Sequence, residues 1–220
     1  MRGVFHLRPP VSRYTKTWDV GIVLNYLREL YPATKLPLKD LTHKLVMLLA
    51  LTSAQRVQTL YHMNLDKMNL TDKNMECVLD KKLKQNQPGR SGCSIQVSAY
   101  KADSRICVIR YLREYLRRTK DIRGQERFLL ICYRKPYHRA SSQTISRWIK
   151  LTMRSAGVNT EFKAHSTRAA STSTAKRMDV PLKDILAQAG WAKENTFQKF
   201  YDRPLESKGK KFTDAVLNSN

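Results

Sequence analysis

Hydrophobic residues in the first quarter of the chain recur with the period of an α-helix. This spacing holds over residues 20–30, between Thr17, a residue type that caps helices, and Pro32, which ends them. A second run over 38–52 is apolar almost all round towards its end. Such a helix is typical of the centre of a hydrophobic core. We therefore expect two helices here, the second of them buried.

The pattern changes from helical spacing to alternation between residues 61 and 100. Cys77 and Leu79 alternate with polar neighbours, as do Ile95 and Val97, and the turn-forming sequence QNQPGRSG lies between the two pairs. Alternation of this kind places every second side chain on one face of a strand. The region predicts a small antiparallel sheet.

Helical spacing returns in the second half of the chain. The predicted helices there are 104–119, 142–156 with Gly157 as its stop, a Ser/Thr-rich stretch after His165, about 181–189 with Gly190 as its stop, and a last helix that carries 197–201. A short helix capped by Ser53 is also expected to carry Arg56, and 127–133 is interpreted as a short strand or a buried extended segment. The predicted fold class is mainly α with a small antiparallel β-sheet (α+β).

One sizeable domain is expected from a chain of 220 residues. We assign residues 17–205 to it, 1–16 to a basic lead-in and 206–220 to a polar C-terminal tail. The longest strongly apolar run, 45–51, is far shorter than the ~20 residues that span a bilayer, and the N-terminus does not resemble a secretory signal. We expect an intracellular protein with no membrane partner.

The charge of the chain indicates an anionic partner. Lysine and arginine number 41 against 18 aspartate and glutamate residues, which gives a net charge of +23. Residues 1–110 carry +10 and 111–220 carry +13, so no basic tail supplies the excess. Basic residues interleaved with core positions fit a folded nucleic-acid-binding surface better than a short membrane anchor. A binder of acidic proteins is the alternative outside this class.

The cysteines and histidines give no pattern of a metal site. The four cysteines, Cys77, Cys93, Cys107 and Cys132, form no CxxC pair, and the five histidines form no HExxH motif. We therefore expect reduced thiols, and neither a metal ion nor a small-molecule cofactor.

Three segments stand out when they are read together. They are ALTSAQRVQTL around Arg56, AHSTRAASTSTAKR over 164–177, and AGWAKENTFQKFYDRPL over 189–205. These segments resemble the signature segments of the tyrosine recombinase (phage integrase) family. The HSTRAAS and TFQKFY sequences are similar to those of recombinases from eukaryotic mobile elements. If the origin is eukaryotic, the resemblance implies a nuclear, DNA-associated protein.

The resemblance implies an active site made of Arg56, His165, Arg168, Trp191 and the nucleophile Tyr201. Two bidentate arginines can neutralise the non-bridging oxygens of an attacked phosphate, and His165 can donate to the same group from one turn before Arg168. An indole N–H donates but cannot shuttle protons, so the implied role of Trp191 is binding and packing. A tyrosine has a pKa of about 10 and is activated when cations favour its phenolate.

The implied reaction is site-specific cleavage and rejoining of double-stranded DNA through a 3′-phosphotyrosyl intermediate, without a metal ion. The family protonates the leaving 5′-oxygen from a lysine in a strand turn. Lys84 matches this position best and Lys82 is the alternative. The residues expected to bind DNA are Lys82, Arg90, Lys101 and Arg147. Strand exchange by this family also implies self-association on DNA.

The sequence departs from the family pattern at three places. Gln58 and Thr59 stand where many members have an acidic residue, so we expect Arg56 to be held differently. Tyr201 follows Trp191 by ten residues, one more than the commonest spacing, and Phe200 occupies the usual position. With 55 residues before Arg56, we expect no separate N-terminal clamp domain.

Two alternative functions remain open from the sequence. The first is a catalytically inactive, domesticated or truncated recombinase fold that binds DNA. The second is strand relaxation by a type IB topoisomerase, because the chemistry is shared.

Overall fold

The computed structural model describes residues 14–79 and 94–206 of the chain. In these ranges the elements are α2 (Val20–Glu29), α3 (Leu38–Ser53), α4 (Val57–Tyr61), β1 (Met68–Leu70), β2 (Asn74–Val78), β3 (Ser94–Ser98), α5 (Val108–Thr119), α6 (Ser142–Ser155), α7 (Ser166–Arg177), α8 (Leu182–Ala189) and α9 (Glu194–Phe200). The fold is mainly helical with a small antiparallel sheet, which confirms the predicted class. Over the same two ranges, no helix is long and apolar enough to cross a membrane.

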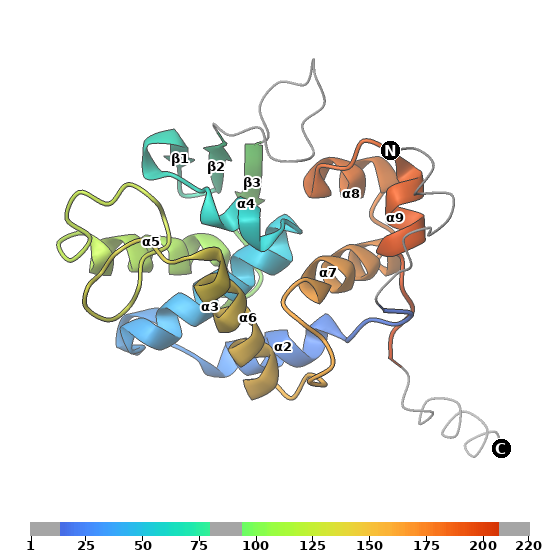
Figure 1. Cartoon of the computed structure of the whole chain (residues 1–220), viewed down its shortest axis with the longest axis horizontal. Coiled ribbons are helices and arrows are strands. Elements are labelled where there is room, and N and C mark those ends of the chain that lie inside the picture. The colour runs from blue at the N-terminus through green and yellow to red at the C-terminus, as the bar shows by residue number, and fades with distance from the viewer. Residues whose placement is uncertain (1–13, 80–93, 207–220) are drawn as a thin grey trace.

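Helix α3 lies at the centre of the fold (Figure 1). Every residue from Leu41 to Leu51 is buried, as the apolar sequence predicts. Helices α5, α6 and α7 and strand β3 pack around α3, and α8 and α9 follow α7 on one side of the molecule. The central helix therefore connects the sheet to the elements that carry the candidate site.

The start of α2 differs from the prediction. Asp19, not Thr17, is the N-cap, and its carboxylate accepts a hydrogen bond from the Gly21 amide at 2.8 Å. The Thr17 backbone instead pairs with the far end of the chain, because its amide donates to the Pro204 carbonyl at 2.8 Å. The long-range contact keeps Thr17 extended and outside the helix.

Ser53 does not cap the helix that follows. It is the last residue of α3, and its hydroxyl donates back to the Leu49 carbonyl at 2.5 Å. Its oxygen also accepts a hydrogen bond from the Gln55 amide at 3.3 Å, but Ser53 lies three residues before the N-cap of α4. The N-cap of α4 is Arg56 itself, so this arginine precedes the short helix.

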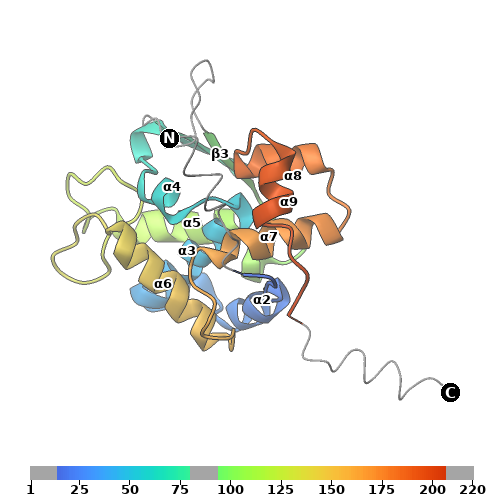
Figure 2. The same cartoon turned by 45° about the vertical axis from the view of Figure 1, so that its right-hand side comes forward.

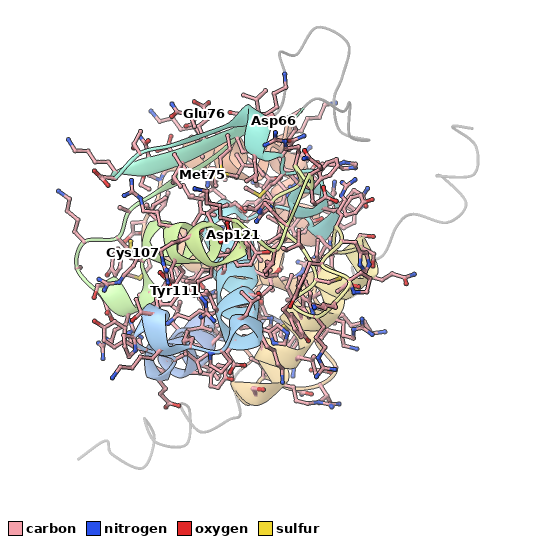
Figure 3. All side chains as sticks on the ribbon, turned by 90° about the vertical axis from the view of Figure 1, so that its left-hand side faces the viewer. Asp66, Met75, Glu76, Cys107, Tyr111 and Asp121 are labelled. Atoms are coloured by element: carbon pink, nitrogen blue, oxygen red, sulfur yellow. The ribbon has the colours of Figure 1, made fainter. Side chains whose placement is uncertain are left out.

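Strand β2 pairs antiparallel with both β1 and β3. The register places Met75 opposite Val97 and Cys77 opposite Ile95, and all four side chains are buried. In Figure 3, Met75 lies on the face of the sheet towards α5 and Glu76 on the outer face. This confirms the predicted sheet. The turn predicted between its strands, with Lys82, Lys84 and Arg90, lies outside the described residues.

The other predicted elements of the second half are found with small shifts. Gly157 and Gly190 follow α6 and α8 with φ angles of +85° and +69°, which favour glycine as a helix stop. A 3-10 turn, Ser104–Ile106, precedes α5, so the helix begins later than expected. Residues 127–133 are extended and carry isolated bridges at Phe128 and Ile131.

Buried His43 predicts a pH dependence of stability. It is 8% exposed and packs against Tyr133 and Trp148, with ring centroids 5.4 and 5.9 Å away. Burial lowers the pKa of His43 from 6.5 to about 4, and Lys39 acts in the same direction, whereas Asp40 opposes it. Between these pH values the unfolded chain binds a proton that the folded chain lacks, so stability falls as the pH falls.

We expect this residue to account for a loss of up to about 3 kcal/mol in the free energy of unfolding between pH 7 and 4. Urea denaturation across this range measures the loss. His43→Phe should give a flatter dependence, and identical slopes for the variant and the wild type would contradict the assignment.

Candidate active site

His165 and Arg168 lie in the first turn of α7. His165 is the N-cap position and is exposed, whereas Arg168 is 1% exposed. The start of the helix is held from outside, because the Trp18 indole donates to the Ser166 hydroxyl at 2.9 Å. The two predicted residues therefore share a helix turn, with the imidazole at the surface and the guanidinium beneath it.

The Arg168 guanidinium joins three segments of the chain. Its two terminal nitrogens donate to the carbonyl of Ala54 at 2.9 Å and to that of Ala189 at 2.7 Å. The guanidinium carbon also lies 4.3 Å from the ring centroid of Trp191, which is a cation–π distance. Arg168 thus connects α7 to the end of α3 and to the end of α8.

Trp191 reaches the site because the chain reverses at Gly190. Gly190 adopts a left-handed conformation, and the Trp191 amide donates to the Leu186 carbonyl at 2.9 Å. The indole is 6% exposed and lies against Phe197 and Tyr201, with centroids 5.6 and 4.5 Å away. Its N–H has no hydrogen-bond acceptor among the described residues. Trp191 therefore contributes to the site by packing its ring against neighbouring side chains.

Tyr201 is the C-cap of α9 and faces His165. Its hydroxyl oxygen lies 3.4 Å from the His165 Nε2, and its side chain is 7% exposed. The backbone is held by Ser173 of α7, whose hydroxyl donates to the Tyr201 carbonyl at 2.6 Å and accepts from the Arg203 amide at 3.0 Å. Helices α7, α8 and α9 lie together in both views (Figure 2). The structure thus brings His165, Arg168, Trp191 and Tyr201 into one cluster.

Arg56 follows a segment that Arg168 holds. It is half-buried, two residues after Ala54, whose carbonyl Arg168 holds. Ala54 has a φ of +51°, an uncommon conformation for a residue with a side chain. The Arg56 guanidinium makes no hydrogen bond or ion pair with any part of the chain that the structure describes. It is a cation that an anionic ligand can pair with directly.

This arrangement is suited to a phosphate. Guanidinium groups bind phosphate oxygens bidentately, and the site holds Arg168 with Arg56 close by in the sequence. Over the two described ranges, no group of three histidine, cysteine or carboxylate side chains is placed to hold a metal ion.

The predicted DNA-binding residues fall in different places. Arg147 lines a pocket of about 670 Å³ between α4 and α6, which also includes Val57, the residue after Arg56. Lys101 lines a separate pocket of about 280 Å³ near the end of β3, with Arg110 and Arg113. The structure does not bring Lys101 and Arg147 together. Lys82, Lys84 and Arg90 lie outside the described residues.

Three residues that hold the cluster were not predicted. They are Ser173, Gln55 and Gln188, whose side chains all bond to backbone carbonyls of other segments. Serine and glutamine are frequent on helices, and a backbone carbonyl has no signature in the sequence. The one available signal was the buried Ser/Thr-rich face of α7, which predicts hydrogen-bonded hydroxyls but not their partners.

The chain matches a known protein family and several solved structures. A model of the phage integrase family matches residues 24–207. No curated protein matches the chain. Among solved structures, XerA recombinase superposes with a TM-score of 0.63 at 17% identity, over 98% of this chain and 68% of that one.

Two structures of DNA complexes also superpose on this chain. XerH recombinase in a pre-cleavage complex with its difH substrate has a TM-score of 0.63 at 11% identity, over 95% of this chain and 56% of that one. A lambda integrase (75-356) dimer bound to a COC′ core site has a TM-score of 0.57 at 18% identity, over 94% and 67%. At sequence identities of 11–18%, these superpositions show a shared fold only. Membership of the family rests on the family model, which matches residues 24–207. The chain belongs to the phage integrase family and has the fold of a tyrosine recombinase catalytic domain.

Proposed function

We propose that this chain is the catalytic domain of a site-specific DNA recombinase that cleaves and rejoins strands through a 3′-phosphotyrosyl bond at Tyr201. The observation that carries the proposal is the position of the Tyr201 hydroxyl, 3.4 Å from His165 Nε2 and in a ring cluster with Trp191 and the Arg168 guanidinium. Family membership supports the same class of reaction. We propose residues 17–205 as this domain, between the lead-in 1–16 and the tail 206–220.

In the proposed cleavage step, the Tyr201 oxygen attacks the phosphorus of a DNA phosphodiester, and the proton of its hydroxyl passes to His165 Nε2, which lies 3.4 Å away. A bond forms between the tyrosyl oxygen and phosphorus, and the bond from phosphorus to the 5′-oxygen breaks. The leaving oxygen takes a proton from Lys84, with Lys82 as the alternative donor. The reverse step uses a 5′-hydroxyl as the nucleophile, so rejoining needs no external energy source.

The cations of the site have separate roles in this proposal. Arg56 and Arg168 neutralise the non-bridging oxygens as negative charge grows on them, and His165 donates to the same group. Arg168 also holds the backbone of the site through its bonds to Ala54 and Ala189. Trp191 packs beneath Tyr201 and fixes the direction from which its hydroxyl approaches.

The proposed partner is double-stranded DNA, with self-association on it. The net charge of +23 supplies the general attraction. The pocket between α4 and α6 starts beside Arg56 and is lined by exposed Arg147, Lys150 and Arg154, three cations on one face of α6. We propose that the duplex runs from the phosphate site along this face. Lys101 would contact DNA at a second place, near the sheet.

Covalent capture on nicked DNA tests the proposed function. A pool of end-labelled duplexes with a randomised core and a nick beside each position lets the short cleaved strand diffuse away, so the covalent complex accumulates. We expect a labelled protein band on a denaturing gel, also in the presence of EDTA. Salt-dependent DNA binding without this band would favour the inactive DNA-binding protein. Relaxation of supercoiled plasmid by a monomer, without strand exchange, would favour the topoisomerase.

A further inference from the structure

The segment that carries Arg56 is tied to the end of α8 by two glutamine side chains. The Gln55 amide nitrogen donates to the Gln188 carbonyl at 2.7 Å, and Gln55 is 6% exposed. The Gln188 amide nitrogen donates in return to the Thr52 carbonyl at 2.9 Å. The two residues therefore bond the end of α3 to the end of α8 in both directions. We call Gln55 and Gln188 the glutamine pair.

Gln188 also reaches the sheet. The same amide nitrogen donates to the Gln96 carbonyl of β3 at 2.9 Å. An amide nitrogen has two hydrogens, and here each has its own acceptor, one on α3 and one on β3. A single half-buried side chain thus holds three separate elements in register.

The glutamine pair and Arg168 bond to the same two segments of the backbone, the end of α3 and the end of α8. Arg168 bonds to the carbonyls of Ala54 and Ala189, and the glutamine pair bonds to those of Thr52 and Gln188. These four bonds fix residues 52–55 against residues 188–189. Arg56 follows the first segment directly, and Gly190 and Trp191 follow the second. These side chains therefore bond the segment before Arg56 to the segment before Trp191.

The residues just after Arg56 do not provide this support. Gln58 is exposed, and its amide nitrogen lies 3.1 Å from His62 Nε2, one turn further along α4. Thr59 is buried, and its amide donates to the Arg56 carbonyl within the first turn of α4. Both contacts stay within residues 56–62 and bond α4 neither to α8 nor to the sheet.

We propose that Gln188, acting with Gln55, is a positioning residue that places Arg56 opposite Trp191 and Arg168 across the phosphate site. Its effect on catalysis rests on the proposed function, whereas its effect on the backbone does not. A displacement of about 1 Å at a reacting centre can lower a rate by about a hundredfold. Loss of the two Gln188 bonds is therefore expected to slow cleavage with little effect on DNA affinity.

Gln188→Met tests this inference, because methionine has a similar length, no charge and no donor. Gln125→Met, at an exposed loop glutamine, is the matched control. We expect Gln188→Met to lower the rate of covalent capture about ten- to hundredfold. Its dissociation constant for DNA should stay within about twofold of the wild type, and its melting temperature should change little. The control should match the wild type in all three measurements.

Hydrogen–deuterium exchange gives a readout that does not need cleavage. We expect faster exchange over residues 52–60 and 188–191 in Gln188→Met, and unchanged exchange in α2. Gln55→Met should have a similar effect, and the double variant should be less than additive, because both residues belong to one set of bonds.

The outcomes separate this inference from the proposed function. Faster local exchange with slower capture at unchanged affinity supports the positioning role. Wild-type exchange and a wild-type capture rate in Gln188→Met overturn it, as does an additive double variant. If the wild-type chain captures no DNA, the proposed function fails, and the exchange data alone then decide whether the glutamine pair holds the Arg56 segment.

Discussion

Replacing Tyr201 with phenylalanine is expected to abolish covalent capture of DNA, a loss of at least about 1,000-fold. The variant removes the proposed nucleophilic oxygen and nothing else. Stability should change little, because the hydroxyl's one hydrogen-bond contact among the described residues is the 3.4 Å approach to His165, while the ring keeps its packing on Trp191. Capture assays and thermal melting measure the two effects.

The neighbouring aromatic residue supplies a matched control. Phe200 is half-buried at the end of α9 and packs against the group of buried apolar residues that includes Trp191 and Tyr201. Phe200→Leu should keep covalent capture. Phe200→Tyr combined with Tyr201→Phe should stay inactive, because it moves the hydroxyl one residue back along the chain, away from His165. Capture by this double variant would show that the nucleophile position was assigned wrongly.

Replacing Arg168 is expected to damage both the fold and the reaction. Arg168→Ala leaves the carbonyls of Ala54 and Ala189 without donors and opens a cavity beside Trp191. We expect a loss of about 3 kcal/mol or more in the free energy of unfolding, because buried polar groups lose their partners. Urea denaturation measures this loss, and capture should fall below detection.

Two further variants separate the contributions of Arg168. Arg168→Lys keeps the charge but cannot reach both carbonyls in a fixed plane, so it should recover some stability and little cleavage. Arg127→Ala removes an exposed arginine whose nearest carboxylate, Asp66, is 3.8 Å away, and should cost less than about 0.5 kcal/mol. If Arg168→Ala is as stable as Arg127→Ala, the buried bonds described for Arg168 do not form.

Much of the fold could be predicted because its signals are local. The apolar run of α3 predicts a central helix, and Gly157 and Gly190 predict where α6 and α8 end, since a left-handed residue follows each helix. The sheet followed from the alternation at Cys77 and Ile95, which face each other in the register. In each case neighbouring residues suffice to determine the element.

The two wrongly predicted helix caps have different causes. Thr17 and Asp19 are both residue types that cap helices, and the pairing of Thr17 with Pro204 selects Asp19. Ser53 bonds within α3 and leaves Arg56 as the N-cap of α4. The first error depends on a partner far along the chain, whereas the second depends only on where α3 ends and α4 begins.

The candidate site was also predicted only in part. The order and spacing of the motifs predicted a cluster, and the structure brings His165, Arg168, Trp191 and Tyr201 together. The burial of Arg168 beneath the His165 turn was not predicted, because helix periodicity says which residues share a face and not how deep each side chain lies. The glutamine pair was missed because its acceptors are backbone carbonyls.

The identity of the residue that becomes linked to DNA tests most directly whether Tyr201 is the nucleophile. The captured complex can be digested with protease and nuclease, and the peptide that retains a nucleotide can be sequenced by mass spectrometry. We expect a phosphodiester link to Tyr201, within the sequence TFQKFYDRPL. A link to any other residue would contradict this expectation.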